Sequence, residues 1–142
     1  MLFFKQGFNR WKFPPTEVVF AGMVFLVALH VIATAFYLYW FYWWLDTVMH
    51  LLGGLWTALF VIWLFGRCDF FTKLSFEKRF FFILICVFFV AVSWEVFELI
   101  LENVDPSMGL IYWLDTFGDV TAGLLGGSLA AVLNFDIKKP SF

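Results

Sequence analysis

The sequence predicts an all-α integral membrane protein, a bundle of four transmembrane helices preceded by a short N-terminal interfacial segment. Of its 142 residues, 63% are hydrophobic and 14% are charged, whereas a soluble domain has about 45–50% apolar and about 25% charged residues. The mean hydropathy is +0.91. A soluble fold of this length lacks the interior to bury so much apolar surface. The composition therefore excludes a cytosolic enzyme, a nucleic-acid-binding protein and a disordered chain.

The first predicted element is a cytoplasmic interfacial segment, residues 1–15, in which aromatic and basic side chains precede Pro14-Pro15. The transmembrane domain follows at 16–135. Its four apolar stretches, each long enough to cross a hydrocarbon core of about 30 Å, lie at about 17–40, 46–65, 80–101 and 113–134. None shows the alternation of a barrel strand, so all four are predicted to be helices. Residues 136–142 are predicted to be a cytoplasmic tail.

The basic residues predict the orientation in the membrane. All nine Lys and Arg fall in the N-terminal segment, in the loop 66–79 or in the C-terminal tail, which lie on one side of a four-helix topology. The positive-inside rule makes that side cytoplasmic, in a bacterial-type inner (plasma) membrane. Cys68 and Cys86 fall in the cytoplasmic half, where thiols stay reduced, and they lack the spacing of a zinc or redox motif.

Ligand-type side chains gather in the outer half of three helices. They form three pairs spaced three or four residues apart: Asp46 and His50, Glu95 and Glu98, and Asp115 and Asp119. This spacing places both members of a pair on one helix face. Because the second and fourth helices run inward and the third runs outward, the three pairs lie at a similar depth. A stripe of small residues that continues from Asp119 through Gly123 and Gly127 predicts that the acidic pair of the last helix points into the bundle.

The charges of these pairs require compensation. Five carboxylates in a partly desolvated site repel one another, and no Lys or Arg lies in the outer half. Either most of the acids are protonated or cations are bound; one divalent ion would leave a formal charge of −3 and two would leave −1. Oxygen ligands with one imidazole suit Zn²⁺, Mn²⁺, Fe²⁺, Mg²⁺ or Ca²⁺. All six residues are therefore candidate metal ligands for one or two ions, and no organic cofactor is expected.

Simpler interpretations remain open for single residues. Asp46 and Asp115 lie near helix starts and could be N-caps. Glu95 and Glu98 lie near the end of their helix, where the dipole disfavours negative charge, so capping does not explain them. His30 is alone in the first helix and is expected to be a packing residue first and a metal ligand second.

The three helical motifs, taken in order, resemble a known family. The runs Trp44-Leu45-Asp46 to His50-Leu51-Leu52-Gly53-Gly54, Trp94-Glu95-Val96-Phe97-Glu98, and Leu114-Asp115-Thr116 with Asp119 and Gly123 are similar to motifs of the YjdF-like small bacterial inner-membrane proteins, which are distant relatives of the VanZ-like group. Thr121-Ala122-Gly123 departs from the family, which often has Asn or Asp followed by Gly-Ala at this point. The resemblance implies a fold and a set of important positions. The VanZ-like link also points to lipid chemistry at the outer leaflet.

Three functions remain open at this stage. A metal-binding membrane protein could hydrolyse or transfer a lipid head group, with the ion activating water and a spare Glu acting as base. Alternatively, the chain is a non-catalytic subunit of a larger membrane complex in which the acids hold a structural ion. The third function is proton or ion transport, because carboxylate and His relays also mark such pathways. The expected partners are the lipid bilayer and either further copies of the chain or a larger membrane complex, without nucleic acid.

Overall fold

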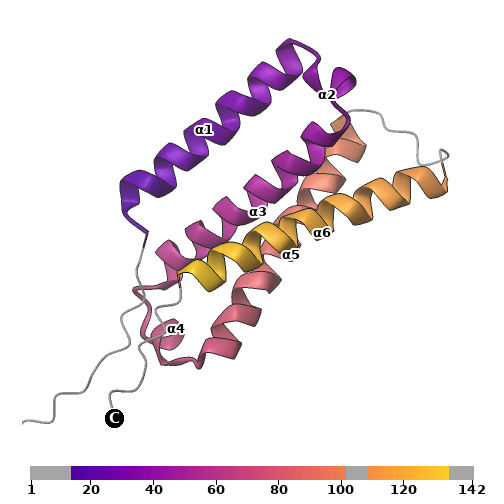
Figure 1. The fold of residues 1–142 in the computed structure, drawn as a ribbon. Coiled ribbons are helices and arrows are strands. Elements are labelled where there is room, and N and C mark those ends of the chain that lie inside the picture. Colours follow the sequence, from indigo (N-terminus) through magenta and orange to yellow (C-terminus); the bar gives the residue numbers. More distant parts are fainter. Residues whose placement is uncertain (1–13, 102–108, 135–142) are drawn as a thin grey trace, which may run out of the picture.

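The computed structural model describes residues 14–101 and 109–134 of the chain. Four helices there are long and apolar enough to cross a membrane: α1 (Thr16–Ala35), α3 (Trp44–Phe65), α5 (Phe76–Leu101) and α6 (Leu110–Leu133). Two short helices, α2 (Leu38–Phe41) and α4 (Asp69–Lys73), lie between them, and the described residues contain no strand. The prediction of an all-α membrane bundle is thus confirmed (Figure 1).

The helix limits differ most from the predicted ones in two places. Instead of continuing to residue 40, α1 ends at Ala35, and Tyr37 adopts a left-handed backbone conformation with φ 55°. Because a positive φ interrupts a right-handed helix, α2 forms as a separate turn. At the other end of the bundle, the predicted loop 66–79 contains α4 and the first residues of α5, so α5 begins at Phe76 rather than at residue 80. The charged residues interpreted as a loop extend this helix beyond its apolar run.

The starts of α3 and α6 differ slightly from the prediction, and the two terminal segments are not tested. The helices α3 and α6 begin two or three residues earlier than predicted, at Trp44 and Leu110. The predicted interfacial segment, apart from Pro14 and Pro15, and the predicted tail 136–142 lie outside the described residues.

The closest helix pair is α3 with α6. A Cβ atom added to Gly54 would collide with the backbone of Gly123, and one added to Gly126 would collide with the backbone carbonyl of Leu51. Such backbone contact between transmembrane helices requires glycine. The small-residue stripe of α6 therefore lies at a helix interface, as predicted. Unlike Gly123 and Gly126, Gly118 near the start of α6 is exposed, and an added Cβ there would meet no atom within 4 Å.

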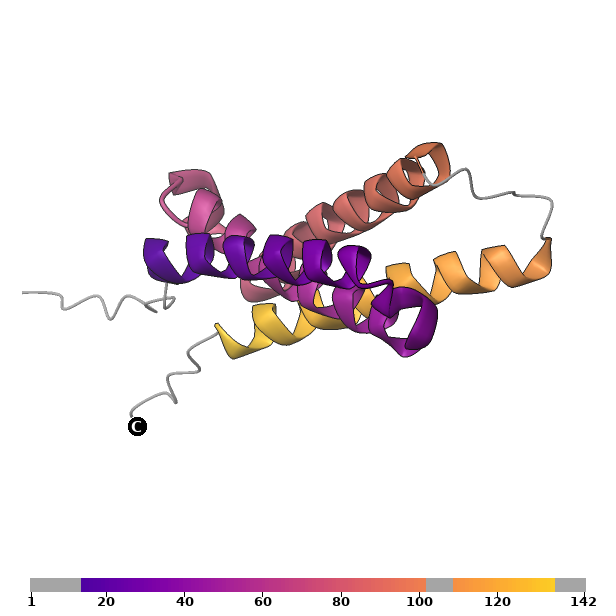
Figure 2. The same ribbon diagram turned by 90° about the horizontal axis from the view of Figure 1, so that it is seen from above.

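The bundle is packed differently at its two ends. The apolar core consists of Ala58, Val61, Ile62, Phe71, Ile83, Val87, Ala130 and Ala131, and it lies near the end that carries α4. Towards the opposite end, α5 and α6 diverge from each other (Figures 1 and 2). The first helix, α1, packs mainly on α3 and on the short α2. One end of the bundle is therefore closed, and the other is open.

Candidate functional site

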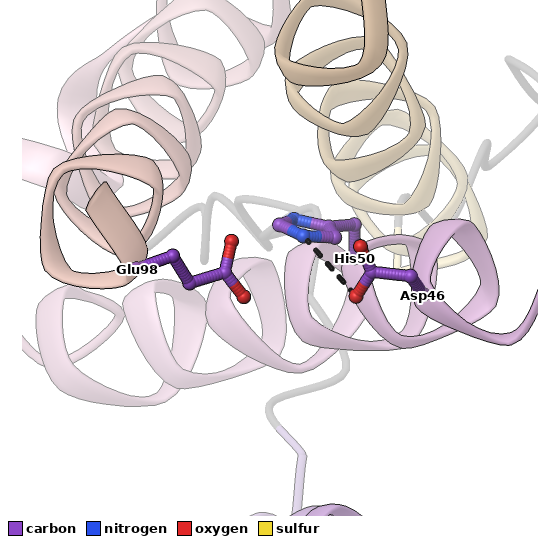
Figure 3. A group of neighbouring side chains, drawn as sticks. All are labelled: Asp46, His50 and Glu98. Atoms are coloured by element: carbon purple, nitrogen blue, oxygen red, sulfur yellow. Dashed lines mark ion pairs between the residues drawn. The ribbon is translucent and has the colours of Figure 1, made fainter. Parts of the chain in front are cut away.

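The six residues predicted as metal ligands lie together at the open end of the bundle. They form three triads: Asp46, His50 and Glu98; His50, Glu95 and Asp119; and Asp46, Asp115 and Asp119. In each triad, one ligand atom per residue lies within 4.8 Å of the other two. Because the triads share members, the six side chains make one group, here called the acid cluster, to which α3, α5 and α6 each contribute two residues. Figure 3 shows Glu98 of α5 reaching towards Asp46 and His50 of α3.

The centre of the acid cluster is a buried imidazole that faces a buried carboxylate. His50 is 8% exposed and Glu95 is 9% exposed. The Nε2 atom of His50 lies 3.5 Å from Oε1 of Glu95 and 3.9 Å from Oδ1 of Asp46. Within the described residues, neither Nε2 of His50 nor Oε1 of Glu95 makes a hydrogen bond. A buried polar atom left unsatisfied costs about 1–3 kcal/mol, so both atoms are poised for a partner.

The other members of the acid cluster differ in exposure. Asp119 is 3% exposed, Asp46 and Glu98 are partly buried, and Asp115 is exposed. The prediction that both acids of α6 point into the bundle is right for Asp119, whereas Asp115 faces the acid cluster and the polar cavity from an exposed position. The physical reason is the divergence of α5 and α6, which leaves the first turns of α6 without a covering helix (Figure 2). Asp115 still lies within ligand distance of Asp46 and Asp119.

The helix-cap interpretation of two aspartates is also wrong. Trp43 occupies the N-cap position of α3 and Gly109 that of α6, and neither helix has a side-chain capping hydrogen bond. Asp46 is in the first turn of α3, and Asp115 lies farther along α6. Neither carboxylate is explained by capping, although Asp46 still lies near the positive end of its helix dipole.

Aromatic residues hold one edge of the acid cluster in place. The indole Nε1 of Trp94 donates a 2.6 Å hydrogen bond to Oε1 of Glu98, four residues later on α5. The same indole contacts the ring of His30 edge to face, with centroids 5.5 Å apart. The Nδ1 atom of His30 lies 3.0 Å from the hydroxyl of Tyr39, so His30 is a hydrogen-bonded packing residue and belongs to none of the triads. Sequence reasoning missed the role of Trp94, which its spacing of four residues from Glu98 could have indicated.

Two cavities border the acid cluster. The first, of about 340 Å³, is lined by all five cluster acids together with aromatic residues and Thr116. The second, also of about 340 Å³, lies among α1, α3 and α5 and has a mainly apolar lining. Four residues line both cavities: His30, Tyr39, Asp46 and Glu98. The sequence did not reveal the second cavity, because its aromatic and aliphatic walls resemble ordinary lipid-facing positions.

The hydroxyl groups of Ser93 and Thr116 differ in their surroundings. Ser93 donates a 2.7 Å hydrogen bond to the carbonyl of Phe89 on its own helix, which satisfies it locally. Thr116 lines the polar cavity beside Glu95. Of these two hydroxyls, only that of Thr116 borders the space next to the acids.

Comparison with known proteins identifies a family. No curated protein and no solved structure gave a match. A family model described as predicted membrane protein (DUF2238) matches residues 2–139. This match agrees with the resemblance to YjdF-like membrane proteins and gives no support to the more distant VanZ-like link. Since the model covers nearly all of the sequence and the fold carries four candidate spans, the chain belongs to the predicted membrane protein family DUF2238.

Proposed function

We propose that the acid cluster binds one or two divalent metal ions at the outer face of a bacterial-type inner membrane, and that the bound metal supports hydrolysis or transfer on membrane lipid head groups. The observation that carries this proposal is the buried pair of His50 Nε2 and Glu95 Oε1. The two atoms face each other at 3.5 Å without a hydrogen bond to either.

The spacing of the donor atoms suits metal coordination. Ligands bound at about 2.0–2.2 Å to a tetrahedral ion lie roughly 3.4 Å from one another. The distance of 3.5 Å between His50 Nε2 and Glu95 Oε1 is close to this value. Within each of the three triads the donor atoms lie within 4.8 Å of one another, so small side-chain movements would complete a coordination shell. One imidazole among carboxylates suits Zn²⁺, Mn²⁺ or Fe²⁺, and the oxygen-rich part suits Mg²⁺ or Ca²⁺.

The charge distribution favours a bound cation over compensation by Lys or Arg. Within the described residues, the four Lys and Arg are Arg67, Lys73, Lys78 and Arg79, all of which belong to the connection between α3 and α5 or to the start of α5. They therefore lie at the opposite end of the bundle from the acid cluster. A group of partly buried carboxylates is costly unless opposite charge compensates it. A divalent ion supplies that charge.

The arrangement also leaves room for chemistry. The polar cavity of about 340 Å³ lies directly against the acid cluster, so a head group has space beside the ion. A divalent metal polarises a phosphoryl or carbonyl oxygen and lowers the cost of ionising a bound water molecule. The exposed Asp115 is placed to accept a proton, because it borders the cavity while the buried His50 and Glu95 remain available as ligands.

Transport has less support than metal-dependent chemistry. A proton or ion path would need polar groups through the closed end of the bundle. Among the residues that the structure describes, the buried core there consists of aliphatic residues and Phe71 and contains no titratable side chain.

Elemental analysis of the purified full-length protein tests the proposal. The protein in detergent is equilibrated with Zn²⁺, Mn²⁺, Fe²⁺, Mg²⁺ or Ca²⁺, separated from free metal, and analysed before and after chelation. We expect one or two ions per chain of the preferred metal. The Glu95→Gln variant keeps the shape of the side chain and removes its charge, so its metal affinity should fall roughly 10–100-fold.

The matched control is Glu77→Gln, the same chemical change at an exposed position near the start of the same helix, which should bind metal like the wild type. Metal retained by Glu95→Gln with wild-type affinity would refute the ligand role of Glu95. A wild-type protein that retains none of the five metals would refute the metal site as a whole.

A further inference from the structure

The apolar cavity among α1, α3 and α5 lies beside the polar cavity, a position that a chance packing defect would not need to have. It shares His30, Tyr39, Asp46 and Glu98 with the polar cavity, so the two spaces adjoin along one wall. Together they make a site that is acidic in one part and apolar in the other. Its remaining walls include Val27 of α1 and Gly53 of α3. A site of this polarity matches an amphiphile.

The surroundings of the cavity indicate where such a molecule comes from. The wall formed by α1 rests mainly on α3 and α2 and meets α5 through the rings of His30 and Trp94, so the side between α1 and α5 is only partly closed. All three helices are candidate membrane spans, so the medium outside this side is hydrocarbon. The volume of about 340 Å³ falls within the range of ligand pockets, about 300–1,000 Å³. A hydrocarbon chain can therefore enter from the bilayer without crossing water.

From these observations we propose that the apolar cavity holds one hydrocarbon chain of a membrane phospholipid, whose phosphate group lies at the acid cluster. This inference rests on the proposed metal site, because a phosphate beside five acids requires a cation between them. The four Lys and Arg of the described residues lie at the other end of the bundle and do not supply that charge. The chain pocket positions the lipid, and the metal holds the phosphate.

Lipid binding by the full-length protein in detergent tests the inference. The probe is palmitoyl lysophosphatidic acid, which has one chain and a phosphate monoester, and its binding is measured by native mass spectrometry. Glycerol 3-phosphate is the same head group without the chain. We expect the metal-loaded protein to bind the lipid probe at least tenfold more tightly than glycerol 3-phosphate, and we expect chelation to abolish binding of both.

Two variants fill the cavity from two different helices. An added Cβ at Gly53 meets nothing within 4 Å, so Gly53→Leu enters the cavity without striking the backbone. Val27→Trp fills it from α1. Each should weaken lipid binding about tenfold, since overfilled sites lose roughly this much. The matched controls are Gly118→Leu and Val24→Trp, exposed positions that line neither cavity, and both should bind the lipid like the wild type.

Metal content, measured on the same samples, separates the two proposals. If Gly53→Leu and Val27→Trp keep their metal and bind the lipid as well as their controls, the chain pocket is refuted and the metal site stands. If the wild type holds no metal but both filled variants still lose lipid, the chain pocket is supported and the metal site is refuted. Equal binding of the lipid probe and glycerol 3-phosphate would also overturn the inference.

Discussion

The contact between α3 and α6 makes a sharp prediction about two adjacent glycines. Gly53 and Gly54 lie on the same helix, yet an added Cβ meets nothing within 4 Å at Gly53 and collides with the backbone of Gly123 at Gly54. Since the obstacle is backbone, no side-chain rotation relieves it, and α3 and α6 must move apart. Gly54→Ala should therefore destabilise the protein strongly, whereas Gly53→Ala should not.

The size of the difference follows from packing and helix propensity. Overfilling a packed interface costs about 1–3 kcal/mol, and replacing Gly by Ala within a helix gains up to about 1 kcal/mol. Gly54→Ala has both the packing cost and the gain in helix propensity, whereas Gly53→Ala has only the gain in helix propensity. The free energies of unfolding of the two variants should consequently differ by roughly 2 kcal/mol, the midpoint of the packing cost.

Equilibrium unfolding in detergent with increasing SDS, followed by circular dichroism, measures this difference. Metal affinity provides a second readout, because separating α3 from α6 moves Asp119 away from His50. We expect Gly54→Ala to bind metal at least tenfold more weakly and Gly53→Ala to bind it normally. Equal stabilities of the two alanine variants would show that the close contact at Gly54 and Gly123 does not exist in the folded protein.

Three further predictions concern the orientation in the membrane, the hydrogen bond from Trp94 to Glu98, and the pH dependence of metal binding. Reporter fusions at residue 142 and between residues 103 and 109, in the connection of α5 to α6, should give cytoplasmic and extracytoplasmic signals respectively, and a cytoplasmic signal from this connection would remove the basis for an outer-face site. Trp94→Phe keeps a ring against His30 and removes the donor to Glu98, so metal affinity should fall about tenfold with little loss of stability; an unchanged affinity would rule out this supporting role. Metal binding should weaken on acidification, as protons compete for His50 and the carboxylates, and binding that is constant from neutral to acidic pH would contradict direct ligation.

The acid cluster could be predicted from the sequence because the sequence indicates both how deep a residue lies in the membrane and which helix face carries it. The length of an apolar run fixes how far along a span a residue lies, and a spacing of three or four residues places a pair on one face. These two rules brought Asp46, His50, Glu95 and Asp119 to one level of the bundle, where the structure places them.

The features that the sequence did not predict depend on contacts between helices. The exposure of Asp115 follows from the divergence of α5 and α6, which depends on the angle at which the helices cross and not on any local pattern. The end of α1 at Ala35 follows from the backbone conformation of Tyr37 within an aromatic run that has no Gly or Pro. The apolar cavity likewise depends on how α1 packs beside α3 and α5.

The divergence of α5 from α6 also explains why α5 contributes glutamates to the cluster whereas α3 and α6 contribute aspartates. The closely packed α3 and α6 carry aspartates, whereas α5 carries Glu95 and Glu98, whose side chains are longer by one methylene. If α5 needs this length to reach the cluster, Glu95→Asp should fail as a ligand although it keeps the charge. The carboxylate would retreat by about 1.5 Å, one carbon–carbon bond, whereas metal–ligand distances tolerate about 0.2 Å.

This length dependence separates coordination from simple charge balance. We expect Glu95→Asp to lose metal affinity roughly 10–100-fold, the same range as Glu95→Gln. The aspartate and glutamine variants are compared by metal titration at one pH, with Glu77→Asp as the matched exposed control on α5. If charge alone mattered, Glu95→Asp would bind metal like the wild type while Glu95→Gln would not. That result would place Glu95 in the electrostatic surroundings of the ion and outside its coordination shell.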